Sequence, residues 1–187
     1  RALIAAGTGL GQAYLFWDGT RHRPAATEGG HADLAVRNDG EIALLRYLQT
    51  QFGRASAERV LSGPGLVNVF RFLTDEQGQT PHQSVRARMT NADPAAVIGE
   101  AALAGTCPVC VAAVELFVRL YGAQAGNLAL TIMAIGGVYV GGGIVGRLLP
   151  RITTGAFIDA FTPKGRYPHQ MREIPVRVIL DSRTARL

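Results

Sequence analysis

The stretch ALIAAGTGLGQAYLFW, residues 2–17, sets a glycine-rich pentapeptide between two short apolar runs. This arrangement is typical of two strands, residues 2–6 and 12–17, joined by a tight turn. The first glycine turn, residues 7–11, exposes backbone N–H groups with no Cβ atoms in the way, so that it could bind an anion. No lysine follows it as in a Walker loop, and no helix follows it as in a dinucleotide-binding loop. Taken alone, it is better explained as a plain hairpin turn.

A polar stretch downstream, Glu28-Gly29-Gly30-His31-Ala32-Asp33, places two acids and an imidazole close together in the sequence. The glycine pair removes side-chain bulk, so a hydroxylated or charged ligand could come close to the carboxylates and the ring. A third strand over residues 21–27, paired through a turn at residues 18–19, leads into this stretch. The sequence therefore predicts a ligand-binding loop at the edge of a sheet.

Composition limits the class of protein. The 187 residues are 48% hydrophobic and 18% charged, which is typical of a soluble globular domain. No apolar run reaches the ~18 residues needed to span a bilayer. The net charge of +5 comes from scattered arginines and not from a basic block interleaved with aromatics. We expect a cytoplasmic protein with no membrane or nucleic-acid partner, and the start at Arg1 without a methionine suggests a fragment.

Apolar residues recur at helical spacing through the middle of the chain. Asn38 and Asp39 supply N-capping oxygens for a helix that ends at Gly53, and Asp93 caps a helix with Pro94 at its first position. The expected helices cover residues 38–52, a short piece capped by Ser56, then 66–73, 95–103, a core helix from 108 towards 132, 144–149 and 157–161.

Glycine and proline mark the breaks between these helices. Residues 62–65, SGPG, are expected to form a turn that folds the short piece containing Glu58 back against the polar pocket. The alternative for Glu58 is that it only complements the helix dipole on a solvated face. Residues 74–83 are expected to form a surface loop. Gly122 and Gly126 predict a close packing partner for the core helix.

A second glycine cluster, GGVYVGGG, follows the core helix at residues 136–143. We expect a buried strand that ends in the second glycine turn, Gly141, Gly142 and Gly143, before a helix. The carboxyl end of a sheet strand is where α/β proteins hold nucleotides, and close backbone packing without a ligand is the alternative. With a last strand at residues 176–180, the pattern indicates an α/β fold with both parallel and antiparallel pairing.

Cys107 and Cys110 are the two cysteines of the chain and form a single CxxC. Two thiolates cannot complete the four-ligand set of a structural zinc site, so no metal is expected here. A redox pair and two small core or capping residues are the remaining interpretations, and we favour the second because no thioredoxin-like pattern surrounds them.

Several longer strings occur in a fixed order along the chain. They are the first glycine turn, EGGH (residues 28–31), SAERVLSGPG (56–65), AGNLAL (125–130) and GGVYVGGGI (136–144). Together they resemble the bacterial glucokinase family, which has the actin-like, hexokinase-type ATPase fold. The resemblance implies an actin-like ATPase (ribonuclease H-like) domain with a mixed sheet flanked by helices. Residues 1–187 then correspond to the large C-terminal domain, truncated at both ends and without the small N-terminal domain.

The resemblance also implies a reaction, the transfer of the γ-phosphate of ATP to the 6-hydroxyl of glucose, with Mg²⁺ bridging the phosphates. Glu28, His31 and Glu58 match the sugar-binding residues of the family, and carboxylates and imidazole suit sugar hydroxyls. The positions that match nucleotide-binding residues are Gly7, Thr8, Gly9 and Gly11 in the first glycine turn and Gly141, Gly142 and Gly143 in the second.

Some family features are missing from this chain. The first phosphate loop, and the Asn-Asp pair whose Asp is the general base, belong to the domain expected upstream, so no catalytic residue is assigned here and the chain alone is expected to be inactive. Val36 and Gly146 replace prolines that are usual in the family, whereas Arg147 matches. No cysteine cluster follows His31, so the zinc of the related ROK sugar kinases is not implied.

A second function remains open, a sugar-responsive binding or regulatory module that keeps the pocket without catalysis. The sequence also leaves open the choice of hexose, the phosphoryl donor, and whether the protein is a monomer or a homodimer.

Overall fold

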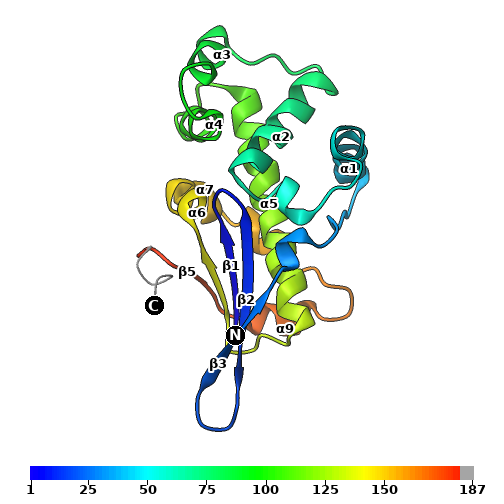
Figure 1. Ribbon diagram of the computed structural model, residues 1–187, viewed down its shortest axis with the longest axis vertical. Coiled ribbons are helices and arrows are strands. Elements are labelled where there is room, and N and C mark those ends of the chain that lie inside the picture. Colours follow the sequence, from blue (N-terminus) through cyan, green and yellow to red (C-terminus); the bar gives the residue numbers. More distant parts are fainter. Residues whose placement is uncertain (182–187) are drawn as a thin grey trace.

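A mixed sheet forms the lower half of the molecule in Figure 1, a computed structural model in which residues 1–181 are described. Within these residues the sheet has five strands in the order β3-β2-β1-β4-β5. The strands are β1 (Ala2–Ala6), β2 (Leu10–Trp17), β3 (His22–Thr27), β4 (Val138–Gly141) and β5 (Val176–Val178). The first three pair antiparallel, and β1, β4 and β5 run parallel. The predicted α/β class with both kinds of pairing is confirmed.

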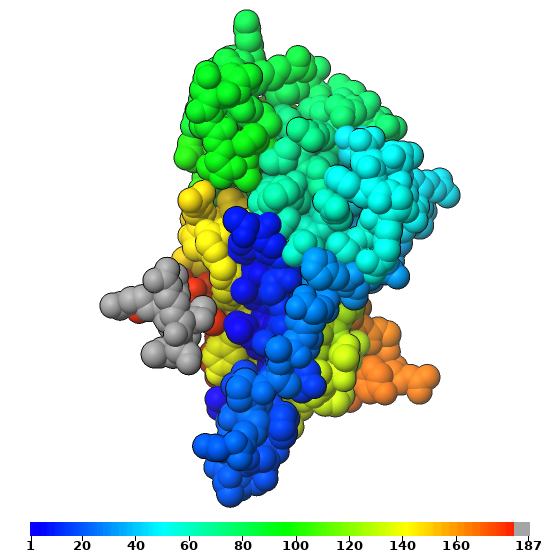
Figure 2. All heavy atoms as spheres, in the orientation of Figure 1, coloured from blue at the N-terminus to red at the C-terminus, as the bar shows by residue number. Residues whose placement is uncertain are grey.

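The turn between β2 and β3 forms where the sequence predicts it. Asp18 Oδ1 accepts hydrogen bonds from Thr20 N and Arg21 N, both at 2.9 Å. A short acceptor side chain that satisfies the backbone of its own turn fixes the hairpin register. The hairpin extends from the lower end of the molecule (Figures 1 and 2), away from the end that carries the glycine turns.

The central element is α5 (Pro108–Thr131), which packs on one face of the sheet. Ala2, Ile4 and Ala6 of β1 alternate inwards and are fully buried, as the period-two side-chain pattern of a strand requires. α5 is long and apolar enough to span a membrane by composition, but most of it is buried inside the protein, as expected of a core helix.

A second helix, α8 (Ala156–Phe161), lies unusually close to α5. A Cβ on Gly122 would lie 2.1 Å from Phe157 O, and one on Gly126 would lie 2.6 Å from Phe161 O. Only glycine permits this distance, so the close partner predicted for the core helix is α8.

The remaining helices lie around and above the sheet (Figure 1). Asn38 Oδ1 caps the first and Asp93 Oδ1 caps the fourth, as predicted. They are α1 (Asp39–Phe52), α2 (Gly63–Asp75), α3 (Gln83–Met89), α4 (Pro94–Leu103), α6 (Gly143–Arg147), α7 (Leu149–Ile152) and α9 (Pro168–Glu173), with short 3₁₀ turns η1 (Gly29–His31) and η2 (Ala57–Arg59).

Two helix starts were predicted wrongly. Residues 62–65 form the first turn of α2 and not a separate turn, because Ser62 Oγ accepts a hydrogen bond from Gly65 N at 3.0 Å and Pro64 occupies a position that needs no N–H donor. Ser56 precedes the single turn η2, and its side chain makes no capping hydrogen bond.

Other boundaries also differ. The helix predicted over residues 144–149 is divided into α6 and α7 at Leu148, just before Pro150, which cannot donate the hydrogen bond that a continuous helix needs. The predicted loop over residues 74–83 starts later, because α2 continues to Asp75. α3 and α9 were not predicted, and the last strand ends at Val178.

Cys107 and Cys110 are both fully buried at the start of α5, with their sulfur atoms 2.8 Å apart. Cys107 occupies the N-cap position but makes no side-chain capping bond. Burial raises the pKa of the Cys110 thiol, which disfavours the reactive thiolate. This buried environment supports the interpretation of the two cysteines as small core residues and does not support a redox pair.

Candidate functional site

In the structure the first glycine turn is only Gly7, Thr8 and Gly9, between β1 and β2, because Leu10 and Gly11 already belong to β2. Gly7 N donates to Gly9 O at 2.9 Å, and Gly63 N at the start of α2 donates to Gly7 O at 2.8 Å. Within residues 1–181, the N–H groups of Thr8 and Gly9 and the Thr8 hydroxyl have no hydrogen-bond partner, and Thr8 is exposed. The turn therefore presents several donors to an anion from a backbone held on two sides.

The same turn holds one of the predicted sugar-binding acids. Leu10 N donates to Glu58 Oε2 at 2.9 Å, from the strand residue that follows the turn. A Cβ on Gly9 would lie 2.6 Å from that oxygen, so glycine is required for the carboxylate to come this close. Of the two alternatives for Glu58, a solvated face or the pocket, the geometry favours the pocket.

The EGGH stretch forms η1 and lies directly on β2. A Cβ on Gly30 would lie 2.0 Å from Leu10 O, and one on Gly29 would lie 2.5 Å from Gln12 Oε1. The glycine pair was expected to open access for a ligand. The structure shows a further reason for the pair: it allows the turn to pack against β2, which brings Glu28 and His31 beside the first glycine turn.

The three predicted sugar-binding residues come together in space. His31 Nε2 lies 3.8 Å from Glu28 Oε2, and His31 Nδ1 lies 3.8 Å from Glu58 Oε1. The Glu28 side chain is 91% exposed, His31 59% and Glu58 31%, so their polar atoms are open to a ligand. A ring between two carboxylates can donate from either nitrogen and offers paired sites for hydroxyl groups.

Two short segments, residues 32–34 and 54–57, run antiparallel and hold η1 and η2 together. Leu34 N donates to Ala55 O at 3.0 Å and Ala57 N donates to Ala32 O at 2.9 Å. Arg54 reaches across from the second segment. Its Nη2 donates to His31 O at 2.7 Å and its Nε to Asp33 Oδ1 at 2.7 Å.

The second glycine turn lies beside the first, at the carboxyl ends of the parallel strands β1 and β4. Gly142 has a φ of +98°, and a Cβ there would lie 2.1 Å from Ala6 O. Around Gly143 the space is open, with nothing within 4 Å of a Cβ. In Figure 2 the dark blue tip of the first turn reaches the surface between the yellow segment that follows β4 and the teal start of α2.

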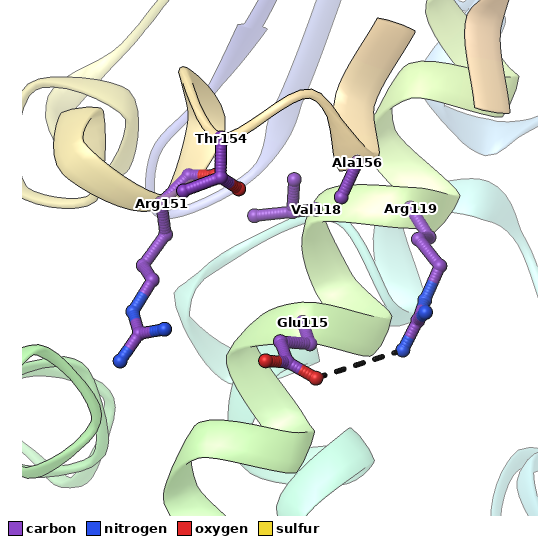
Figure 3. Close-up of a pocket in the computed structure, with 6 residues that line it drawn as sticks. All are labelled: Glu115, Val118, Arg119, Arg151, Thr154 and Ala156. Carbon is purple, nitrogen blue, oxygen red and sulfur yellow. Dashed lines mark hydrogen bonds and ion pairs between the residues drawn. The ribbon is translucent and has the colours of Figure 1, made fainter. Parts of the chain in front are cut away.

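A cavity of about 180 Å³ lies elsewhere, on the side of α5 that faces α7 and α8 (Figure 3). Its lining residues are Glu115, Val118, Arg119, Arg151, Thr154 and Ala156. Arg119 Nη2 lies 3.7 Å from Glu115 Oε2, and Arg151 Nη2 donates to Ala102 O at 2.8 Å. None of the predicted sugar or nucleotide residues lines this cavity. Across residues 1–181, no group of three or more His, Cys, Asp or Glu side chains is suited to hold a metal ion.

Comparison with known proteins decides the family. A family model described as glucokinase matches residues 1–187. The chain belongs to the glucokinase family. It is 42% identical to the glucokinase of Nostoc sp., over 96% of this chain and 56% of that protein. It is 40% identical to the glucokinase of Synechocystis sp., over 97% of this chain and 55% of that protein.

Solved glucokinases have the same fold. A glucokinase from an Antarctic psychrotroph superposes with a TM-score of 0.83 at 31% identity, over 97% of this chain and 54% of that chain. The glucokinase of Balamuthia mandrillaris, at 20% identity and a TM-score of 0.81, shares the fold over 95% of this chain and 49% of its own. The predicted actin-like ATPase fold is confirmed. This glucokinase-family chain spans about half the length of the curated relatives it matches.

Two residues with structural roles in this site were not predicted from the sequence. Arg54 precedes the SAERVLSGPG string, and its contacts with His31 and Asp33 depend on the fold. Tyr121 lies within an apolar helix, with its hydroxyl below both glycine turns. The signal that could have singled out Tyr121 is a polar atom on the buried stripe of a core helix, since such an atom needs a partner.

Proposed function

We propose that this chain is the large, C-terminal domain of an ATP-dependent glucokinase, which transfers the γ-phosphate of ATP to the 6-hydroxyl of glucose in the cytoplasm. One observation carries most of the weight. The Glu58 carboxylate is bound through Oε2 to Leu10 N, next to the first glycine turn, and approaches His31 through Oε1. A sugar held by Glu58 and a phosphate held by that turn would therefore be neighbours.

Glucose is the proposed substrate because its adjacent hydroxyls match the donors and acceptors of the site. Each carboxylate can accept two hydroxyl hydrogen bonds, and His31 can accept one and donate another. The solved glucokinase of Balamuthia mandrillaris is in complex with glucose. A ROK family glucokinase from Streptomyces griseus, at 23% identity and a TM-score of 0.59, is in complex with glucose and AMPPNP.

ATP fits the two glycine turns. The N–H groups of Thr8 and Gly9 are available to phosphate oxygens, and the open space at Gly143 leaves room for a nucleotide beside the backbone. Mg²⁺ would neutralise phosphate charge. It usually binds through substrate phosphates and one or two carboxylates, so it does not require the cluster of three or more ligand side chains that residues 1–181 lack. The general base would come from the other domain.

The experiment is an assay of glucose 6-phosphate formation by the complete enzyme that contains this chain, with and without His31→Ala. We expect ATP-dependent turnover and a glucose KM raised about tenfold or more by the substitution, because it leaves buried polar groups of the complex without partners, which typically costs about 1 to 3 kcal/mol. The matched control is His169→Ala, which removes an exposed histidine 3.7 Å from Glu173 on α9.

Two results would contradict the proposal. Absence of turnover with retained glucose binding would favour the sugar-responsive module, and unchanged kinetics in His31→Ala would remove His31 from the sugar site.

A further inference from the structure

The hydroxyl of Tyr121 lies at the point where β1 and β4 end. It accepts a hydrogen bond from Ala6 N at 3.2 Å and lies 3.1 Å from Ile4 O and 3.2 Å from Gly141 O. Its single proton can be donated to only one of these carbonyls at a time. A side chain from the core helix thus contacts the backbone of both strands.

These contacts fall immediately before both glycine turns. Ala6 precedes Gly7, and Gly141 is the first residue of the second turn. Gly142 packs against Ala6 so closely that no Cβ fits between them. The Tyr121 hydroxyl therefore lies at the base of both turns, where β1 and β4 are paired.

The position of the ring is fixed by its neighbours. Tyr121 is fully buried, and its ring centroid lies 5.8 Å from that of Phe117 and 5.7 Å from that of Phe157, the latter in an edge-to-face arrangement. Interlocked aromatic rings of this kind leave few alternative rotamers. Burial also raises the pKa of Tyr121, so the hydroxyl keeps its proton at any working pH.

We propose that Tyr121 is a positioning residue for the nucleotide: its hydroxyl holds the two glycine turns at the spacing that lets one ATP molecule contact both. This inference rests on the proposed nucleotide role of these turns. Without the hydroxyl, Ala6 N–H loses one acceptor, and β1 and β4 remain paired through Ala5 and Gly141 but lose the side chain that contacts both of their ends. ATP binding would then have to order them, which weakens its affinity.

The test is Tyr121→Phe in the complete enzyme, which keeps the ring and removes the hydroxyl. We expect the ATP KM to rise about three- to tenfold while the glucose KM stays within twofold. The matched control is Tyr47→Phe, which also removes only a hydroxyl group. The Tyr47 hydroxyl donates to Asp75 Oδ2 at 2.9 Å and so connects α1 to α2, without contacting either glycine turn. An unchanged ATP KM, or equal rises for ATP and glucose, would overturn the inference.

A general loss of stability must be distinguished from loss of positioning. Leu48→Val shortens a fully buried side chain on α1 and supplies a variant with a lowered Tm and an intact hydroxyl. If this variant raises the ATP KM as much as Tyr121→Phe does, the effect is a general loss of stability and the inference fails.

Calorimetric titration with AMPPNP separates this inference from the proposed function. If the wild-type enzyme binds AMPPNP but does not phosphorylate glucose, the proposed function is wrong, and the affinity of Tyr121→Phe for AMPPNP still tests the inference. If the wild-type enzyme binds no AMPPNP, the inference is overturned as well.

Discussion

Glu58 is the residue that connects the two halves of the proposed site, because each of its carboxylate oxygens faces a different group. Oε2 accepts from Leu10 N, beside the first glycine turn, and Oε1 lies near His31. Glu28 contacts His31 as well but is 91% exposed. The two acids therefore differ in what their removal would disturb.

We predict that Glu58→Ala in the complete enzyme raises the KM values of both glucose and ATP, because it removes a sugar partner and releases the N–H next to the phosphate turn. Glu28→Ala should raise the glucose KM alone. Each lost partner typically costs about 1 to 3 kcal/mol, which is about 5- to 150-fold in KM. Steady-state kinetics with each substrate varied in turn makes the comparison. If Glu58→Ala left the ATP KM unchanged, the hydrogen bond between Glu58 and Leu10 N would have no role in ATP binding.

Arg54 is predicted to position His31. Arg54→Ala should raise the glucose KM about two- to fivefold with kcat little changed, because the backbone carbonyl of His31 loses a charge-assisted hydrogen bond. Thermal unfolding should change little, since exposed ion pairs contribute only about 0 to 1 kcal/mol.

The matched control for Arg54 is Arg23→Ala, which breaks a similar contact between Arg23 Nε and Asp18 Oδ2 in the β2–β3 hairpin. Equal effects of the two substitutions on the glucose KM would show that Arg54 has no specific role.

At the residue scale, the sequence could identify Glu28, His31 and Glu58 because they stand in strings that resemble a family. It could not identify Arg54, whose hydrogen bonds reach residues 21 and 23 positions away. It also could not show that Gly29 and Gly30 pack against β2, because the nearness of β2 to η1 is a tertiary contact. Sequence patterns report local periodicity and do not report which backbone lies opposite a glycine.

At the element scale, the second glycine turn combines a glycine needed by the fold with one that the fold leaves free. We predict that Gly142→Ala lowers the Tm strongly, because it forces a φ of +98° on a residue with a side chain and places its Cβ 2.1 Å from Ala6 O. Gly143→Ala should leave the Tm within a degree or two, because its Cβ meets no atom within 4 Å.

The same pair tests the nucleotide role of this turn. In the complete enzyme, Gly143→Ala should raise the ATP KM severalfold despite its normal stability, since the new methyl group occupies space proposed for ATP. A normal ATP KM in a stable Gly143→Ala variant would argue against nucleotide binding at this turn.

Helix starts with a capping residue and a proline were predicted well when the proline followed the cap directly, as at Asp93 and Pro94. The start of α2 was missed because the glycines around Pro64 were interpreted as turn residues. In the structure, Ser62 caps α2 and Gly65 allows a close approach to Val60, where a Cβ would lie 2.4 Å from its carbonyl group. A serine with proline two residues later was the signal for the helix start.

At the scale of the whole molecule, Lys164 connects the turn after α8 to α5. Its Nζ donates to Ala123 O at 2.8 Å and to Asn127 Oδ1 at 2.6 Å. Burial, with a smaller contribution from Arg37, lowers the pKa of Lys164 to about 8 from its ordinary 10.5. Between these pH values the unfolded chain binds more protons at this residue than the folded chain does.

We therefore predict that Lys164 makes the free energy of unfolding rise from pH 8 to about 10.5, since the cost of the buried charge is present below pH 8 and is relieved above it. Denaturant unfolding of wild type and Lys164→Met at pH 7 and pH 10 measures this rise as a difference. Arg166→Met is the control, because it removes an exposed positive charge from the same turn. A pH-independent difference for Lys164→Met would contradict the assigned pKa direction.

The overall architecture was largely predictable from the sequence. Strand and helix periods, the Asp18 turn and the glycine turns were enough for the α/β class, and the family strings supplied the actin-like fold. The strand order and the separate cavity near Arg119 depend on long-range packing, which no local pattern encodes.

The most direct measurement is a crystal structure of the complete enzyme with glucose and AMPPNP bound. The account predicts sugar hydroxyls within hydrogen-bond distance of the Glu28 and Glu58 carboxylates and the His31 ring, with phosphate oxygens at the N–H groups of Thr8 and Gly9. Glucose bound away from these three side chains, or phosphates bound away from the first glycine turn, would contradict it.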